Sequence, residues 1–156
     1  MRLTSYTDYS FRVLIYLGVS RGKLSTIREI SESYAISRHH LVKVVHFLGT
    51  LGYVRTVRGK HGGVGLALPP ERINLGQVAR ATEDNFHLVE CFDGELGCCR
   101  ITSVCRLQSV LSEALNAFLG VLDRFTLDAL LANHAELARA LELPPMSHGA
   151  RLGAAP

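Results

Sequence analysis

The order of predicted elements in the first 68 residues constrains the fold of this chain more than any other feature. Thr26 and Glu29 have capping-box spacing, which predicts the start of a short helix. Ser37 lies at a tight junction and can cap a longer helix that ends at Gly52. Short helix, tight junction and second helix in this order are typical of a helix-turn-helix unit.

A longer helix precedes this unit and would pack behind it. Its start is predicted at the hydroxyl side chains of Thr4 and Ser5, and its end at Gly22. Apolar residues in between form a helical stripe of Phe11, Leu14, Ile15 and Leu17. The stripe indicates a helix with one face on the core.

The helix after the junction has one apolar and one basic face. The apolar positions follow the spacing i, i+3, i+4 and i+7 at Leu41, Val44, Val45 and Leu48. The opposite face presents His39, Lys43 and His46, and Arg38 lies in the first turn, where a recognition helix meets base edges. This helix is therefore the predicted recognition helix.

Residues 53–68 alternate apolar and polar side chains about a glycine-rich turn, which predicts a two-stranded wing. The tip of the wing carries Arg58, Lys60 and His61, which suit the phosphates beside a groove. The predicted fold class is mainly α with a small β-hairpin: a winged helix-turn-helix domain plus a long dimerisation helix.

Charge divides along the chain and points to the same partner. Residues 1–63 carry ten Lys and Arg against three Asp and Glu, a formal charge of +7, and residues 64–156 carry seven against eleven, or −4. We therefore expect sequence-specific binding to double-stranded DNA, through Thr26, Ser37, Arg38, His39, His40, Lys43, Arg58, Lys60 and His61. A protein-binding winged helix is the alternative, and a steep salt dependence of affinity would favour DNA.

A second helical pattern follows the wing and predicts a homodimer. Asn74 can cap a short helix, and a long helix then carries a heptad seam of Val104, Leu107, Leu111, Ala114, Phe118, Val121 and Phe125. A helix buried wholly within one subunit is the alternative. The predicted divisions are a DNA-binding domain at 1–80, a cysteine loop at 81–106, the dimerisation and closing helices at 107–143, and a disordered tail at 144–156.

Every cysteine lies between Cys91 and Cys105. The chain has no apolar run of membrane-spanning length and no signal-peptide pattern at its start, so we expect a cytoplasmic protein without a membrane partner. Clustered cysteines in a reducing cytosol favour a metal site, and the absence of a C-x-x-C pair disfavours zinc.

An iron–sulfur cluster suits this spacing better. Cys98 and Cys99 are adjacent and are not expected to bind one cluster together, which leaves three cysteines for the four irons of a 4Fe–4S cluster, preferred here to 2Fe–2S. The candidates for a fourth ligand are His87, Glu90, Asp93, Glu95 and Asp8.

Four stretches carry a family resemblance: LTSYTDY, SRHHLVKVV, VRGKHGGVGLA, and a cysteine followed by CRITSVCRL. To about residue 143, the chain resembles the Rrf-type winged-helix iron–sulfur regulators, and within them the nitric-oxide-sensitive repressors. The resemblance implies cluster ligands at Cys91, Cys99 and Cys105, with Cys98 left over. It also implies an oxygen ligand from Asp8 of the other subunit.

The resemblance further implies a homodimeric repressor with a palindromic operator, which it releases when nitric oxide nitrosylates the cluster. A related branch, which regulates cluster biogenesis, has a histidine three residues past its last cysteine. Gln108 at that position argues against this branch and leaves His87 open.

Other classes of function remain open on the residues alone. A thiol switch could regulate DNA binding by disulfide formation between Cys98, Cys99 and Cys105, or the fold could respond to iron or redox state with no role for nitric oxide. A zinc-bound loop is a further rival. We expect no enzyme, because His87 and His134 have no evident nucleophile setting or acidic orienter.

Overall fold

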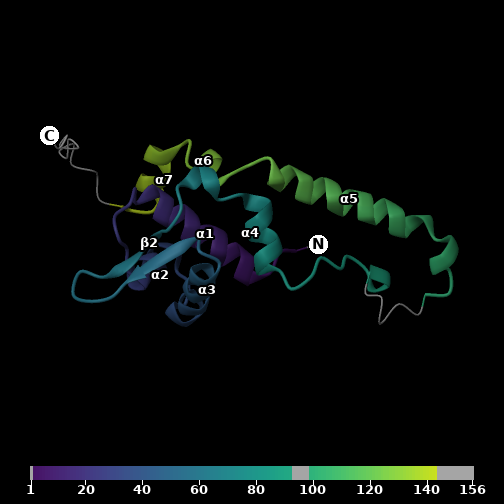
Figure 1. Cartoon of the computed structure of the whole chain (residues 1–156), viewed down its shortest axis with the longest axis horizontal. Coiled ribbons are helices and arrows are strands. Elements are labelled where there is room, and N and C mark those ends of the chain that lie inside the picture. Colours follow the sequence, from purple (N-terminus) through teal and green to yellow (C-terminus); the bar gives the residue numbers. More distant parts are fainter. Residues whose placement is uncertain (1, 93–98, 144–156) are drawn as a thin grey trace.

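The computed structural model describes residues 2–92 and 99–143, and it consists of a helical body with one long helix projecting from it (Figure 1). The body contains the helices α1 to α4 and a two-stranded hairpin, and α5 forms the projection. The predicted tail at 144–156 and the residues Asp93, Glu95 and Cys98 lie outside the described residues.

Helix α1, Ser5–Val19, forms the centre of the body. Thr4 is its N-cap, as predicted, and the Thr4 side chain accepts a hydrogen bond from the backbone N–H of Thr7 at 3.3 Å. The helix ends at Val19, earlier than the predicted end at Gly22. Gly22, at a φ of 82°, belongs to the turn that follows, where a positive φ favours glycine.

Helix α2, Ile27–Tyr34, starts with the predicted capping box: Thr26 and Glu29 exchange backbone–side-chain hydrogen bonds of 2.6 and 3.2 Å. Helix α3, Arg38–Thr50, follows after a turn through Ala35 and Ile36. Ser37 occupies the N-cap position of α3 but makes no side-chain capping bond, so the predicted cap is wrong in its chemistry. The side chain of Ser37 is exposed to solvent.

Strands β1, Val54–Val57, and β2, Gly63–Leu66, form the predicted antiparallel wing. The wing is joined to the body by Ser25, whose backbone N–H and C=O both bond Val64, at 2.9 and 2.8 Å. A Cβ at Gly62 would overlap the carbonyl oxygen of Val57, so the turn at the base of the tip requires glycine.

Helix α4, Leu75–Thr82, starts at Asn74, whose side chain accepts from the N–H of Gln77 at 3.0 Å as predicted. The projecting helix α5 spans Arg106–Asp123 and is shorter than its predicted seam. Val104 falls in the 3-10 turn η3, Thr102–Val104, and Phe125 lies after the end of α5.

Two short helices close the described chain, α6 at Leu127–Leu130 and α7 at His134–Ala140, and both return to the body. The side chains of Leu127 and Leu141 join the core around α1. The ring Nε2 of His134 lies 2.8 Å from the carbonyl oxygen of Val19. None of the helices in the described ranges is long and apolar enough to span a bilayer.

Candidate DNA interface and cysteine loop

Helix α3 is fixed on the body by its apolar face, which leaves the basic face in solvent. Leu41, Val44, Val45 and Leu48 are at most 4% exposed. Contacts from α1 hold a further side of the helix: the Tyr6 hydroxyl donates to the carbonyl oxygen of Lys43 at 3.3 Å, and Tyr9 stacks on His40 with ring centroids 6.2 Å apart. The orientation of α3 is therefore set from two sides.

The structure places all nine predicted DNA-binding residues at the surface of the body, namely Thr26, Ser37, Arg38, His39, His40, Lys43, Arg58, Lys60 and His61. Four of them share the exposed side of α3, and three lie at the tip of the wing. The hydroxyl of Thr26 is already engaged with Glu29, at 2.9 Å. The role of these residues in DNA binding stays a prediction.

Val42 belongs to this surface and was missed by the sequence reading. Its side chain is 51% exposed, although its neighbours Leu41, Val44 and Val45 are buried. Arg55 on β1 is also exposed and was not singled out. The signal for Val42 was present in the sequence, because a valine four residues after Arg38 lies outside the stripe that begins at Leu41.

The start of α5, where the described part of the cysteine loop ends, points away from the body (Figure 1). Cys91 is in the 3-10 turn η2, Glu90–Phe92, and Cys105 is the N-cap of α5; both are half-buried and carry free thiols. The side-chain amide of Gln108 donates to the carbonyl oxygen of Cys91 at 3.3 Å, which joins the two sides of the loop. Cys99 is exposed.

The predicted fourth ligands lie apart from one another. His87 and Glu90 are exposed in the segment that leads to Cys91, whereas Asp8 is in the first turn of α1, within the body. Among the residues that the structure describes, no three His, Cys, Asp or Glu side chains lie close enough together to hold a metal ion. The described part of a single subunit therefore does not assemble the predicted ligand set.

Asp8 instead pairs with Arg12 one turn along α1, with 2.9 Å between Oδ2 and Nη2 and 3.1 Å between Oδ1 and Nε. The guanidinium of Arg12 also lies over the ring of Tyr34 on α2, 5.8 Å from its centroid. Burial raises the pKa of Tyr34 to about 12, and the Arg12 charge opposes the rise. Asp8 is thus connected through Arg12 to the first helix of the helix-turn-helix unit.

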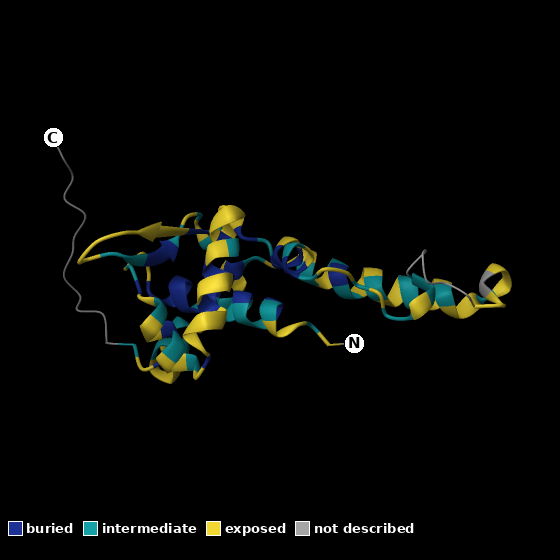
Figure 2. Cartoon of the chain, turned by 90° about the horizontal axis from the view of Figure 1, so that it is seen from below, coloured by how far each residue is buried: buried dark blue, intermediate teal, exposed yellow. Residues whose placement is uncertain are grey.

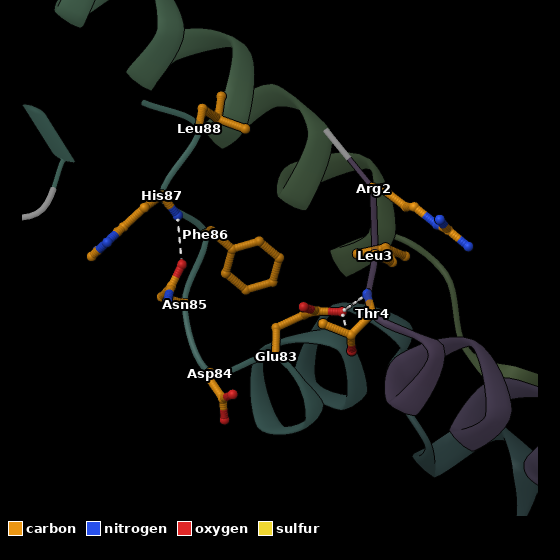
Figure 3. A pocket seen from close by; sticks show the side chains of 9 residues that line it. All are labelled: Arg2, Leu3, Thr4, Glu83, Asp84, Asn85, Phe86, His87 and Leu88. Atoms are coloured by element: carbon orange, nitrogen blue, oxygen red, sulfur yellow. Dashed lines mark hydrogen bonds between the residues drawn. The ribbon is translucent and has the colours of Figure 1, made fainter. Parts of the chain in front are cut away.

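The start of α1 is bound to the end of α4. Glu83 accepts hydrogen bonds from the backbone N–H and the hydroxyl of Thr4, at 2.7 and 3.0 Å (Figure 3). Beneath them, the buried hydroxyls of Thr7 and Thr82 are bonded at 2.9 Å. A half-open cavity of about 280 Å³ lies beside this contact, between residues 2–4 and 83–88.

A second set of contacts fixes the angle at which α5 leaves the body. Arg80 on α4 makes a two-pronged ion pair with Asp123 at the end of α5, with N···O distances of 2.6 and 2.8 Å. The hydrogen bonds from Arg80 lower the pKa of Asp123. Asn74 donates to the carbonyl oxygen of Asp123 at 2.7 Å, so the junction is held by both side chain and backbone.

Beyond this junction, α5 exposes much of its apolar surface. Several side chains of the predicted seam and its flank are 43% to 78% exposed, namely Val104, Leu107, Val110, Val121 and Phe125. Within α5, whose residues are all described, only Leu119 is buried. The structure therefore contradicts the alternative of a helix buried wholly within one subunit.

Known proteins are similar to this chain in sequence and in fold. Residues 3–133 match the Rrf2 family, described as iron-dependent transcriptional regulators. The chain is 52% identical over 144 residues to the HTH-type transcriptional regulator NsrR of Bacillus subtilis, covering 92% of this chain and 99% of that protein. It is 50% identical over 146 residues to NsrR of Halalkalibacterium halodurans, covering 93% and 100%.

A solved structure has the same architecture. The oxidized form of CymR from Staphylococcus aureus superposes with a TM-score of 0.66 at 27% identity, covering 85% of this chain and 97% of that one. The predicted fold class is thereby confirmed.

Proposed function

Because the chain belongs to the Rrf2 family of iron-dependent transcriptional regulators, and is a regulator of its NsrR branch, we propose that it is a homodimeric repressor. It binds a palindromic operator in duplex DNA and releases this operator when nitric oxide reacts with a bound iron–sulfur cluster. The observation that carries the proposal is the match to NsrR regulators at about half identity over nine-tenths of the chain.

The reading surface consists of α3 and the wing. Arg38, His39 and Lys43 project from α3 toward solvent and are available to bases and phosphates in the major groove. Arg58 and Lys60 at the wing tip are available to the flanking backbone. Two copies are needed to read a palindrome, and the exposed apolar face of α5 supplies the surface that a second copy would cover.

The thiols of Cys91, Cys99 and Cys105 would hold the cluster, and their chemistry fits it. Thiolates are the ordinary ligands of iron–sulfur clusters, and these three come from one loop next to the start of α5. Asp8 of the other subunit would supply the fourth ligand of a 4Fe–4S cluster, since within one subunit Asp8 belongs to α1 in the body, whereas Cys105 is the N-cap of α5 at the end that points away from the body (Figure 1). The cluster, when bound, supplies iron that reacts with nitric oxide.

The residues around Asp8 suggest how the loop is coupled to the recognition helix. Arg12 holds the Asp8 carboxylate and stacks on Tyr34, which belongs to α2. Glu83 accepts hydrogen bonds from Thr4, the N-cap residue at the same end of α1, and starts the segment that leads to Cys91. A change in the partner of Asp8 therefore acts on α1 and α2 at once and shifts α3 relative to its half-site.

The proposal is tested on protein purified without oxygen. We expect a visible absorption band, iron and acid-labile sulfide, and binding to a palindromic promoter fragment that is lost on addition of nitric oxide. The Cys99→Ser variant is expected to lose iron and sulfide. Colourless, iron-free wild-type protein whose DNA binding follows thiol oxidation would instead support the thiol switch, and bound zinc would support a structural metal.

The ligand role of Asp8 needs a variant that separates coordination from its ion pair. We expect Asp8→Ala to keep a cluster and to bind the fragment with a weaker response to nitric oxide. Arg12→Gln removes the ion pair and the contact with Tyr34 but keeps the Asp8 carboxylate, so it is the matched control. If Arg12→Gln reproduces the whole effect of Asp8→Ala, the carboxylate acts through α1 packing and the ligand role is refuted.

A further inference from the structure

We propose that Val42 reads the C5-methyl group of a thymine in each half-site of the operator. The inference rests on the proposed function, because it assigns one base contact to a surface that binds duplex DNA. The contact would determine which operator sequence is bound, and the family match does not give this sequence.

Val42 belongs neither to the buried core of the described residues nor to the partly buried side chains packed against that core. It is 51% exposed, while the apolar positions around it on α3 are 0% to 4% exposed. Valine is also a poorer helix former than most residues found on exposed helix faces. Packing and helix propensity therefore give no reason for valine at this position.

Its neighbours on the helix are the residues expected to face DNA. Arg38 and His46 lie four residues before and after Val42, so the three form one row along the exposed side of α3. Lys43 is the next residue and is also exposed. An α-helix that inserts this side into the major groove brings Val42 to the base edges between two polar side chains.

The chemistry of Val42 selects among the groups found there. Its side chain has no donor or acceptor, so it cannot pair with the N7, O6, N6 or N4 groups that carry the polar code of the groove. The thymine methyl is the apolar group on the major-groove edge, and aliphatic side chains contact it. Within α3, all of whose residues are described, Val42 is the only large apolar side chain that is exposed, and it lies in the same row as Arg38.

The test compares thymine with uracil, which differ only by this methyl. Duplexes that bind the full-length, oxygen-protected protein are selected from a randomised library, and the best palindrome is resynthesised with uracil at each thymine in turn. We expect one position per half-site at which uracil weakens binding about fourfold, or about fifteenfold when both half-sites are changed, as expected for a buried methyl. Val42→Ala should bind the thymine and uracil duplexes equally.

Val57→Ala is the matched control, because Val57 is 39% exposed on strand β1 and lies outside the recognition helix. It should retain the full preference for thymine. The inference is overturned if Val42→Ala keeps that preference, or if Val57→Ala loses it equally. Failure to enrich any duplex over random DNA would overturn the proposed function itself, and this outcome is distinct from loss of the methyl effect alone.

Discussion

The body and the projecting helix differ in burial: buried residues gather in the body, whereas α5 is mostly intermediate or exposed (Figure 2). In the body, Val13, Leu14 and Leu41 are fully buried. On the projection, Leu107 and Val110 are 60% and 58% exposed. The body therefore has a buried core of its own, whereas α5 has apolar side chains that no other described part of the subunit covers.

The two regions should therefore respond to different perturbations. Loss of a core side chain in the body lowers the free energy of unfolding of each subunit. If a second copy covers α5 as proposed, loss of an apolar side chain on this helix should leave the subunit intact and weaken the contact between copies.

The largest effect is expected for Leu107→Glu on α5. A symmetric contact loses two leucines and gains two buried charges, so the dimer should be weakened by about 3–6 kcal/mol or more. Sedimentation equilibrium measures the dissociation constant, and circular dichroism shows whether the subunit still folds. Asn116→Glu adds the same charge at an exposed polar position of α5 and is the control. A dimer that survives Leu107→Glu would place the subunit contact elsewhere.

Truncation of the body core should show the reverse pattern. Leu14 is 0% exposed at the centre of α1, and Leu14→Ala is expected to cost about 2–5 kcal/mol of unfolding free energy. Urea denaturation measures this loss. The dimer dissociation constant, measured where the variant is still folded, should change little. A large rise in that constant would mean that the body and the α5 contact are not separable.

Gly76 at the junction and Gly120 on the projecting helix differ in how closely other atoms approach them. A Cβ at Gly76 on α4 would overlap Oδ1 of Asp123, whereas a Cβ at Gly120 on α5 meets nothing within 4 Å. Gly76→Ala should therefore displace the side chains of Asp123 and Arg80 and break their exposed ion pair, which costs up to about 1 kcal/mol of unfolding free energy. Gly120→Ala should raise the helicity of α5 and stabilise it by about 0.5–1 kcal/mol.

Denaturation curves and far-ultraviolet circular dichroism distinguish the two glycine variants. If Gly76→Ala and Gly120→Ala change the free energy of unfolding equally, the junction is packed as loosely as the rest of α5.

Local features of both regions could be predicted from the sequence. The caps at Thr4, Thr26 and Asn74 and the stripe of α3 depend on residues within a few positions of each other, and the structure confirms them. The exposed seam of α5 was likewise predicted, because its heptad spacing is a property of one helix.

Contacts between distant segments could not be predicted. Thr4 and Glu83 are 79 positions apart, and Arg80 and Asp123 are 43 apart, so no local spacing relates them. The pairing of Asp8 with Arg12 has i, i+4 spacing and could have been predicted from the sequence. For the candidate site, the sequence predicted which residues are involved. It could not predict which distant residues they contact, because those contacts depend on tertiary packing.

The smallest effect is expected for Asp123→Asn at the junction, because both members of the pair with Arg80 are more than 40% exposed and solvent screens such pairs. Arg80 lowers the pKa of Asp123 in the folded state below its ordinary 3.8. The ion pair therefore contributes stability above about pH 4, and the contribution is lost as the pH falls through the folded pKa. Urea midpoints of wild type and Asp123→Asn should differ at pH 6 and converge toward pH 3.

High salt at pH 6 should reduce the difference between these two midpoints, since salt screens the ion pair. A difference that persists at low pH and high salt would show that the effect of Asp123→Asn does not come from the charge of the ion pair.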